Sequence, residues 1–376
     1  MTKPPVPVVI PALLIMASGT AVLSTDLYTP SLPHLQEVFD TDAGRVQLTL
    51  TLNLIAYALA QLFYGPLSDR IGRRPVLLIG MVGFALSTAL CAMAGSIDEL
   101  ILGRILQGLT ACAEAVVGYA VIRELYDEAG AVRILAAYGM AIALAPAVGP
   151  IIGGHMHVWF GWRSNFVLLT GIIVVAVALI WRFLPETLVT PDRHALRPRR
   201  MLRGYWALLR DGPFMTYTLI MSLVFGGLFA IIAEFPFLYI ERLGLATEQY
   251  GYYYATIIVA FFFGSLVVNR AAGRLGSDQM LAAGLGLGLL GEIAFVLMLA
   301  VGWQDAPFIA VAITASQCLF ALGLGLIFAT APVRAFDVCR AGHGYAAAML
   351  GALPMAGSAL GTFCVVLLHD GSAWPA

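Results

Sequence analysis

Apolar runs long enough to cross a lipid bilayer dominate this chain. A membrane-spanning helix needs about 20 mainly apolar residues, and such runs fill most of the 376 residues. Only 11% of the residues are charged, whereas a soluble globular protein has about 25%. This composition excludes a nucleic-acid-binding protein, a secreted disulfide scaffold and a disordered chain, and it predicts an all-α polytopic membrane protein. We expect eleven spans, at 7–27, 46–66, 75–95, 99–122, 132–155, 164–184, 213–239, 249–269, 279–302, 307–330 and 342–368.

Basic residues are unevenly distributed between the two sets of connections. With the N-terminus in the cytoplasm, 17 of the 21 basic residues fall at cytoplasmic positions and three at outer positions, while Arg104 lies within a span. Cytoplasmic loops of membrane proteins carry an excess of lysine and arginine. The sequence therefore predicts a multi-pass protein with a cytoplasmic N-terminus.

The polar interval 185–212 contains six arginines and separates six spans from five. We interpret it as a cytoplasmic linker between a six-helix half, residues 1–184, and a second half, residues 213–376. Residues 369–376 look like an outer loop that leads into one more helix. We therefore expect that a twelfth span is missing from this chain, and a natural eleven-span protein is the alternative.

Five ionisable residues lie within the predicted spans, where a charge costs at least about 2.5–3.5 kcal/mol. They are Asp26, Arg104, Glu114, Glu234 and Glu292. Asp26 and Arg104 have opposite charges at similar depth, so we expect them to pair, with Asp26 alternating between a proton and Arg104. A static ion pair, or an Asp26 that caps its helix at the outer interface, is the alternative.

The three glutamates leave more alternatives open. Glu234 and Phe235 precede Pro236, which disturbs a helix and can open a binding cavity, so a substrate or proton ligand is expected there; an interfacial glutamate is the alternative. Glu114 is a weaker candidate for proton coupling. Glu292 stands among glycines, where close helix packing explains it as well as function does.

Asn53, Tyr57 and Gln61 recur every four residues and form a polar stripe on one helix face. In lipid such a stripe must face the protein interior, so it is either the wall of a substrate cavity or a set of interhelical hydrogen bonds. Tyr119 adds a further candidate for substrate contact.

Metal binding and enzymatic catalysis have little support in the sequence. His155 and His157 are too close along one helix to form a site without a third ligand, and no P-loop, HExxH, GxSxG or CxxC motif is present. We therefore expect no cofactor, no metal and no enzymatic activity. The absence of a P-loop argues against transport driven by ATP.

Four segments resemble motifs of the major facilitator superfamily. They are GPLSDRIGRRP at 65–75, LGRILQG at 102–108, PAVGPIIGG at 146–154 and STDLYTP at 24–30. Together they resemble the Bcr/CflA subfamily of drug–proton antiporters, which comprises bicyclomycin and chloramphenicol resistance proteins, over essentially the whole chain. The resemblance implies two six-helix halves related as parallel repeats, in the bacterial inner membrane.

The resemblance also implies roles for individual residues. Asp26 would be the proton-linked acid and Arg104 its partner. A latch and gate between helices would contain Gly65, Asp69, Arg70, Gly72, Arg73, Arg74, Gly149, Pro150, Gly153 and Gly154. Ala145 stands where the pattern often has glycine, Glu234 adds a charge that can favour cationic compounds, and the family has twelve helices.

The sequence thus predicts a proton-coupled antiporter that exports small, mostly apolar drugs by alternating access. Its expected partners are the drug or metabolite, protons and the bilayer, with no nucleic acid, and the protein is expected to be a monomer. Two alternatives remain: an exporter of one metabolite such as a sugar or nucleoside, and a non-transporting membrane sensor or scaffold.

Overall fold

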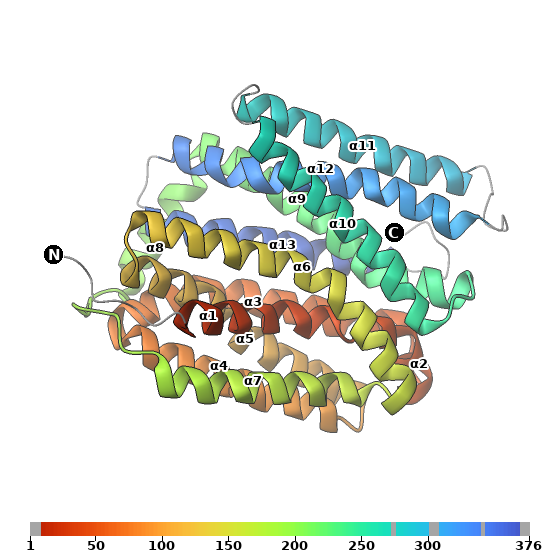
Figure 1. Ribbon diagram of the computed structural model, residues 1–376, viewed down its shortest axis with the longest axis horizontal. Helices are drawn as coiled ribbons and strands as arrows, with labels where there is room; N and C mark the ends of the chain where they lie inside the picture. Colours follow the sequence, from red (N-terminus) through yellow and green to blue (C-terminus); the bar gives the residue numbers. More distant parts are fainter. Residues whose placement is uncertain (1–8, 272–275, 301–307, 340–342, 369–376) are drawn as a thin grey trace.

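The computed structural model describes residues 9–271, 276–300, 308–339 and 343–368, and the regular elements in these ranges are all helical (Figure 1). The first half comprises α1 (Val9–Asp26), a 3₁₀ turn (Thr29–Ser31), α2 (Leu32–Phe39), α3 (Ala43–Ile71), α4 (Arg73–Met93), α5 (Ile97–Leu125), α6 (Glu128–Phe160) and α7 (Arg163–Phe183). The linker carries α8 (Pro198–Leu209). The second half comprises α9 (Gly212–Pro236), a π-helical turn (Phe237–Arg242), α10 (Thr247–Ala271), α11 (Ser277–Ala300), α12 (Ile309–Val338) and α13 (His343–Leu368).

Eleven segments of the described residues are long and apolar enough to cross a membrane, which confirms the predicted number of spans. The first continues to Phe39 instead of ending near residue 27. Pro30 and Pro33 each stand at the start of a short helix, where proline is tolerated, so they redirect the chain without ending the span. The predicted tail at 369–376 lies outside the described residues.

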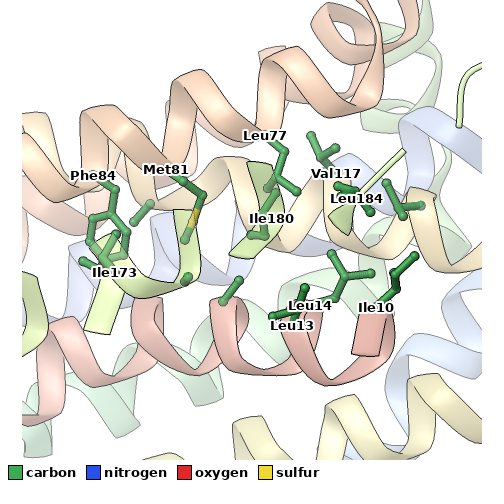
Figure 2. Packing of buried hydrophobic residues seen from close by; sticks show 14 of the residues in the cluster. Ile10, Leu13, Leu14, Leu77, Met81, Phe84, Val117, Ile173, Ile180 and Leu184 are labelled. Carbon is green, nitrogen blue, oxygen red and sulfur yellow. The ribbon is translucent and has the colours of Figure 1, made fainter. Parts of the chain in front are cut away.

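The helices form two groups that meet along two seams. Helices α1 and α3–α7 pack together, as do α9–α13, while α3 lies against α13 and α6 lies against α10 (Figure 1). In the first group, Leu14 of α1, Leu77 and Phe84 of α4 and Ile180 of α7 belong to one apolar cluster (Figure 2). Lipid provides no hydrophobic drive for helices to associate, so this close packing holds the group together.

The linker contains an amphipathic helix, α8, that the sequence reading did not predict. Met201 and Leu208 of α8 are buried, and the Tyr205 hydroxyl donates a hydrogen bond to the Leu62 carbonyl of α3 at 2.8 Å. Burial, together with nearby Tyr345 of α13, raises the pKa of Tyr205 to about 12, so the hydroxyl keeps its proton and remains a donor. Helix α8 therefore touches both groups of helices.

Candidate functional site

Arg104 of α5 is fully buried and is held by oxygens that carry no net charge. Its Nη1 donates to the Ser24 carbonyl at 2.8 Å and to Oε1 of Gln107, and its Nε donates to the Thr49 carbonyl at 3.4 Å. The guanidinium carbon lies 4.5 Å from the centroid of the Tyr28 ring, an attractive cation–π arrangement. These contacts tie α5 to α1 and α3 near the predicted outer end of the bundle.

The predicted ion pair between Asp26 and Arg104 is wrong for this conformation. Asp26 ends α1 and is 4% exposed. Its carboxylate has no hydrogen-bond or ion-pair partner among the described residues. The guanidinium instead uses its donors on α1 and α3 carbonyls and on Gln107, although its Nη2 is buried without a partner in the described chain. Similar depth in the membrane was therefore not enough to bring the two charges together.

Asp26 lies where α1 meets α6 and α10. A Cβ added at Gly149 of α6 would stand 2.7 Å from the Asp26 Cβ. From α10, the hydroxyls of Tyr250 and Tyr254 lie within electrostatic range of the Asp26 carboxylate. Since α10 belongs to the second half, Asp26 is a buried acid at the seam between the two halves.

Glycines of α6 allow this seam to close. Gly153 lies against the Leu27 carbonyl so closely that a Cβ would overlap it, and a Cβ at Gly154 would stand 2.9 Å from the Thr247 carbonyl oxygen of α10. On the facing helix, a Cβ at Gly251 would be 2.7 Å from the Ile151 Cα. Close approach of helix backbones in membranes depends on small residues of this kind. Pro150 lies at the same contact, within α6.

We expect Gly153→Ala to destabilise the protein by about 1–3 kcal/mol, because the added methyl group must displace the Leu27 backbone. Gly139→Ala in the same helix is the matched control, since a Cβ there meets no atom within 4 Å. The thermal midpoint of each purified variant in detergent is the measurement. A Gly153→Ala midpoint equal to that of Gly139→Ala would contradict the proposed tight contact.

Hydrogen bonds join the two halves near the predicted outer end. Gln47 of α3 donates through Nε2 to Oε2 of Glu234 at 2.8 Å, and both side chains are buried. The Thr51 hydroxyl of α3 donates to the Thr362 hydroxyl of α13 at 2.8 Å. Glu234 is therefore a contact between the two halves. Phe235 packs into the apolar core of the second half.

The members of the predicted polar stripe have different surroundings. Asn53 donates through Nδ2 to the Arg104 carbonyl at 2.7 Å, so it makes the interhelical hydrogen bond that was the alternative to a cavity wall. Gln61 contacts Gly351 of α13 closely enough to exclude a Cβ there. Tyr57 is half-buried, and Tyr119 is 44% exposed.

The segment 65–75 is the end of α3, Gly72 and the start of α4, and its charged residues form a compact ionic network between α3, α4 and α5. Arg73 is 9% exposed, and its Nη2 lies 2.6 Å from Oδ1 of Asp69 and 2.9 Å from Oε1 of Glu124. Gly72 has a φ of 120°, which residues with a side chain rarely adopt. The Glu186 carboxylate accepts from the backbone N–H groups of Arg73, at 2.9 Å, and Arg74, at 3.2 Å.

One expectation for this segment needs correction. Arg70 is exposed and forms no ion pair in the described part of the chain. The network also joins helices of the first half to the linker, where Asp192 donates through its backbone N–H to the Asp69 carbonyl. Gly65 has only ordinary contact with Val116.

Glu114 lies deep in the first half and is 2% exposed. Neither of its carboxylate oxygens has a hydrogen-bond partner within the described ranges. Tyr57 and Tyr138 are within its electrostatic range. Glu114 is therefore a second buried acid, separate from Asp26.

No group of three or more histidine, cysteine, aspartate or glutamate side chains that could hold a metal occurs in the described residues. His157 instead makes an edge contact with His34, with ring centroids 5.1 Å apart. His155 lies with Nδ1 2.9 Å from the Ile151 carbonyl.

Several residues of these networks were missed by sequence reasoning. Gln107 follows Arg104 by one helical turn, and this spacing was a usable signal for a contact between them. Glu124 and Glu186 join the Arg73 network from distant parts of the chain, and Gln47 reaches the second half. No local pattern marks these three residues.

Comparison with known proteins places this chain among membrane transporters. The profile of the Major Facilitator Superfamily matches residues 14–363. The Pseudomonas aeruginosa chloramphenicol resistance protein is 32% identical over 94% of this chain and 83% of its own. A Haemophilus influenzae bicyclomycin resistance protein homolog is 30% identical over 72% of this chain and 68% of its own, and the Yersinia pestis multidrug transporter MdfA is 30% identical over 84% and 76%.

Solved structures share the fold. A D-xylose–proton symporter superposes with a TM-score of 0.75 at 16% identity, covering 97% of this chain and 91% of that one. A bacterial homolog of the human lysosomal transporter Spinster gives a TM-score of 0.76 at 13% identity, covering 96% and 82%. At these identities the likeness concerns the arrangement of the helices alone.

Proposed function

Because the chain belongs to the major facilitator superfamily and is thus a membrane transporter rather than an enzyme, we propose that it is a proton-coupled antiporter exporting small, mostly apolar drugs. The single observation that carries the proposal is Asp26, a buried carboxyl group without a partner at the seam between the halves. The drug-resistance names of the relatives support the substrate class. The protein would act as a monomer in the bacterial inner membrane, with its N-terminus in the cytoplasm.

The proposed cycle follows from where Asp26 lies. A charged carboxylate at membrane depth is costly, so the seam between α6 and α10 closes over Asp26 only when the acid holds a proton. We therefore assign the present conformation, in which that seam is closed, to the proton-loaded stage. Drug then enters from the cytoplasm and favours release of the proton to the cytoplasm. Loss of the proton lets the seam open, and the opposite rocking of the halves carries the drug outward.

Arg104 would act at the other stage of the cycle. Its Nη2 is buried without a partner in the described chain. We propose that this nitrogen meets the Asp26 carboxylate when α1 moves away from α6, which stabilises the charged acid after the proton leaves. The pairing expected from the sequence would thus be transient.

Other residues would serve binding and gating. Glu234 would link proton state to the outer contact through Gln47, and Glu114 would be a second acid of the coupling machinery. Tyr57, Gln61 and Tyr119 would contribute to the substrate path. The Asp69–Arg73–Glu124 network, with Gly72, would hold the cytoplasmic ends of the first half together.

A drug-challenge panel tests the proposal. Cells with and without the gene are exposed to chloramphenicol and chemically varied drugs, and drug accumulation is measured before and after a proton uncoupler is added. We expect lower accumulation of several drugs in cells with the gene, and loss of that difference with the uncoupler. Protection confined to one metabolite would indicate a dedicated exporter, and equal accumulation throughout would contradict transport of these drugs.

A further inference from the structure

Helix α8 packs one face against the protein and leaves the opposite face uncovered. Met201 and Leu208 are buried on the packed face. On the outward face, Leu202, Trp206 and Leu209 are 70%, 55% and 44% exposed. Their spacing of four and three residues places them in one stripe along the helix. Large apolar side chains gathered in this way are suited to contact with an apolar phase rather than with water.

Arginines lie beside this apolar stripe. Arg199, Arg203 and Arg210 are exposed, and their helical positions fall within about 40° of one another. None of the three forms an ion pair in the described part of the chain, whereas Arg200 pairs with Asp192 at 2.6 Å. The sequence of α8 contains no acidic residue. The outward face of α8 therefore carries positive charge that no acid of the described protein balances.

The apolar stripe and the arginines meet in a hollow of the surface. Leu202, Arg203 and Trp206 line this hollow, which has a volume of about 490 Å³. The guanidinium carbon of Arg210 lies 4.8 Å from the centroid of the Trp206 ring, an attractive arrangement that holds the charge beside the aromatic side chain. A hollow with an apolar floor and a cationic edge matches a molecule that has an anionic group next to a hydrocarbon part.

The attachment of α8 to α3 places this face at the boundary of the membrane. The Tyr205 hydroxyl donates to the Leu62 carbonyl at 2.8 Å, and Leu62 belongs to one of the eleven spans. Leu62 follows the exposed Ile55 and Leu59 by seven and three residues, so it shares the side of α3 that other helices leave uncovered. The next charged residue of α3, Asp69, is about 10 Å further along the helix axis. Helix α8 therefore lies at the depth of the lipid headgroups.

We propose that the outward face of α8 binds the headgroup of an anionic phospholipid through Arg199, Arg203 and Arg210, with Leu202 and Trp206 inserted among the lipids. Guanidinium groups bind phosphate oxygens through paired N–H donors, and tryptophan is enriched where membrane meets water. Helices with arginines beside leucine and tryptophan lie in this interface. The site is separate from the buried acids and does not depend on exchange of drug for protons.

Lipid binding to the purified full chain tests the proposal. Native mass spectrometry gives the dissociation constants of phosphatidylglycerol and of phosphatidylcholine with the same acyl chains. The test variant is Arg203→Gln/Arg210→Gln. The matched control is Arg123→Gln/Arg133→Gln, which also removes two exposed arginines, near the junction of α5 and α6. Thermal midpoints confirm that each variant is folded.

We expect wild type and the control to bind phosphatidylglycerol about tenfold or more tightly than phosphatidylcholine, because each basic residue near the membrane surface adds attraction to an anionic lipid. The test variant should lose most of this preference. Equal affinities of wild type for the two lipids would overturn the inference. A folded test variant that keeps the full preference would overturn it as well.

Trp206 fluorescence shows whether the apolar stripe enters the membrane. The full chain is placed in vesicles of phosphatidylcholine and phosphatidylglycerol, and the emission of Trp206 is the difference between wild type and Trp206→Phe. We expect this emission to be quenched by lipids brominated on their acyl chains and to be shielded from iodide in the water. Quenching by iodide alone would contradict the proposal, since the face would then be open to a soluble partner.

Discussion

Asp26→Asn is expected to reduce proton-driven drug transport to the level of membranes without the protein. Asparagine matches aspartate in shape but cannot take up or release a proton, and Asp26 is the acid that the α6–α10 seam covers. Everted membrane vesicles energised with a proton gradient give the measurement, as uptake of labelled chloramphenicol against external pH. Asp98→Asn is the control, since this aspartate is exposed and pairs with Arg45 at the surface.

A second assay separates loss of coupling from loss of folding. In proteoliposomes without a proton gradient, Asp26→Asn should still exchange labelled for unlabelled chloramphenicol, because a permanently neutral side chain lets the seam close. Uptake by Asp26→Asn vesicles with the pH dependence of wild type would contradict the role of Asp26.

Arg104 substitutions are expected to have the second-largest effect, through stability as well as transport. Arg104 donates to carbonyls of α1 and α3 and to Gln107, and each hydrogen bond from a charged group contributes about 1.5–3 kcal/mol. Lysine keeps the charge but lacks the planar fork that reaches several acceptors. We expect Arg104→Lys to transport at under about a tenth of the wild-type rate, because it loses at least one such bond.

Arg104→Ala should accumulate poorly, since the bonds from α5 to α1 and α3 are lost and the buried Oε1 of Gln107 loses its donor. Size-exclusion profiles, thermal midpoints and vesicle uptake are the measurements. Arg123→Ala, at the exposed end of the same helix, should behave as wild type. Wild-type stability and transport in Arg104→Lys would show that the hydrogen-bond fork is not needed.

The apolar runs predicted the spans well, because bilayer thickness dictates helix length. The predicted ends of the spans were less accurate. The first span was expected to end at residue 27, but the short helix that contains Pro30 continues it. Helix α8 was missed because its six flanking and internal arginines dominate the composition of the interval. The buried positions, Met201 and Leu208, are too few to stand out as an apolar run.

The candidate site was predictable in its residues but not in its contacts. The free-energy cost of a charge at membrane depth singled out Asp26, Arg104 and Glu114. All three are buried. Pairing between Asp26 and Arg104 depends on how α1 and α5 are rotated about their axes, and periodicity does not supply that. The hydrogen bond from Asn53 to the Arg104 carbonyl likewise depends on how α3 and α5 are rotated about their axes.

Contacts between distant segments were beyond the sequence reading altogether. The approach of Gly153 to Leu27, and of Gly154 to α10, requires knowing which helices are neighbours. The motif resemblance marked these glycines without saying what they touch. Gly153 lies against Leu27, next to Asp26 in the sequence, and this contact connects the α6 motif to the acid proposed to carry the proton.

Proton movement driven by drug alone tests the central claim most directly. Purified protein is placed in liposomes that contain a pH-sensitive dye, and a chloramphenicol gradient is imposed with no initial pH difference. Exchange of drug for protons predicts that the interior becomes more alkaline when drug flows in and more acidic when drug flows out. This pH change should be absent with Asp26→Asn. Drug movement through the wild-type protein without any pH change would contradict proton-coupled antiport.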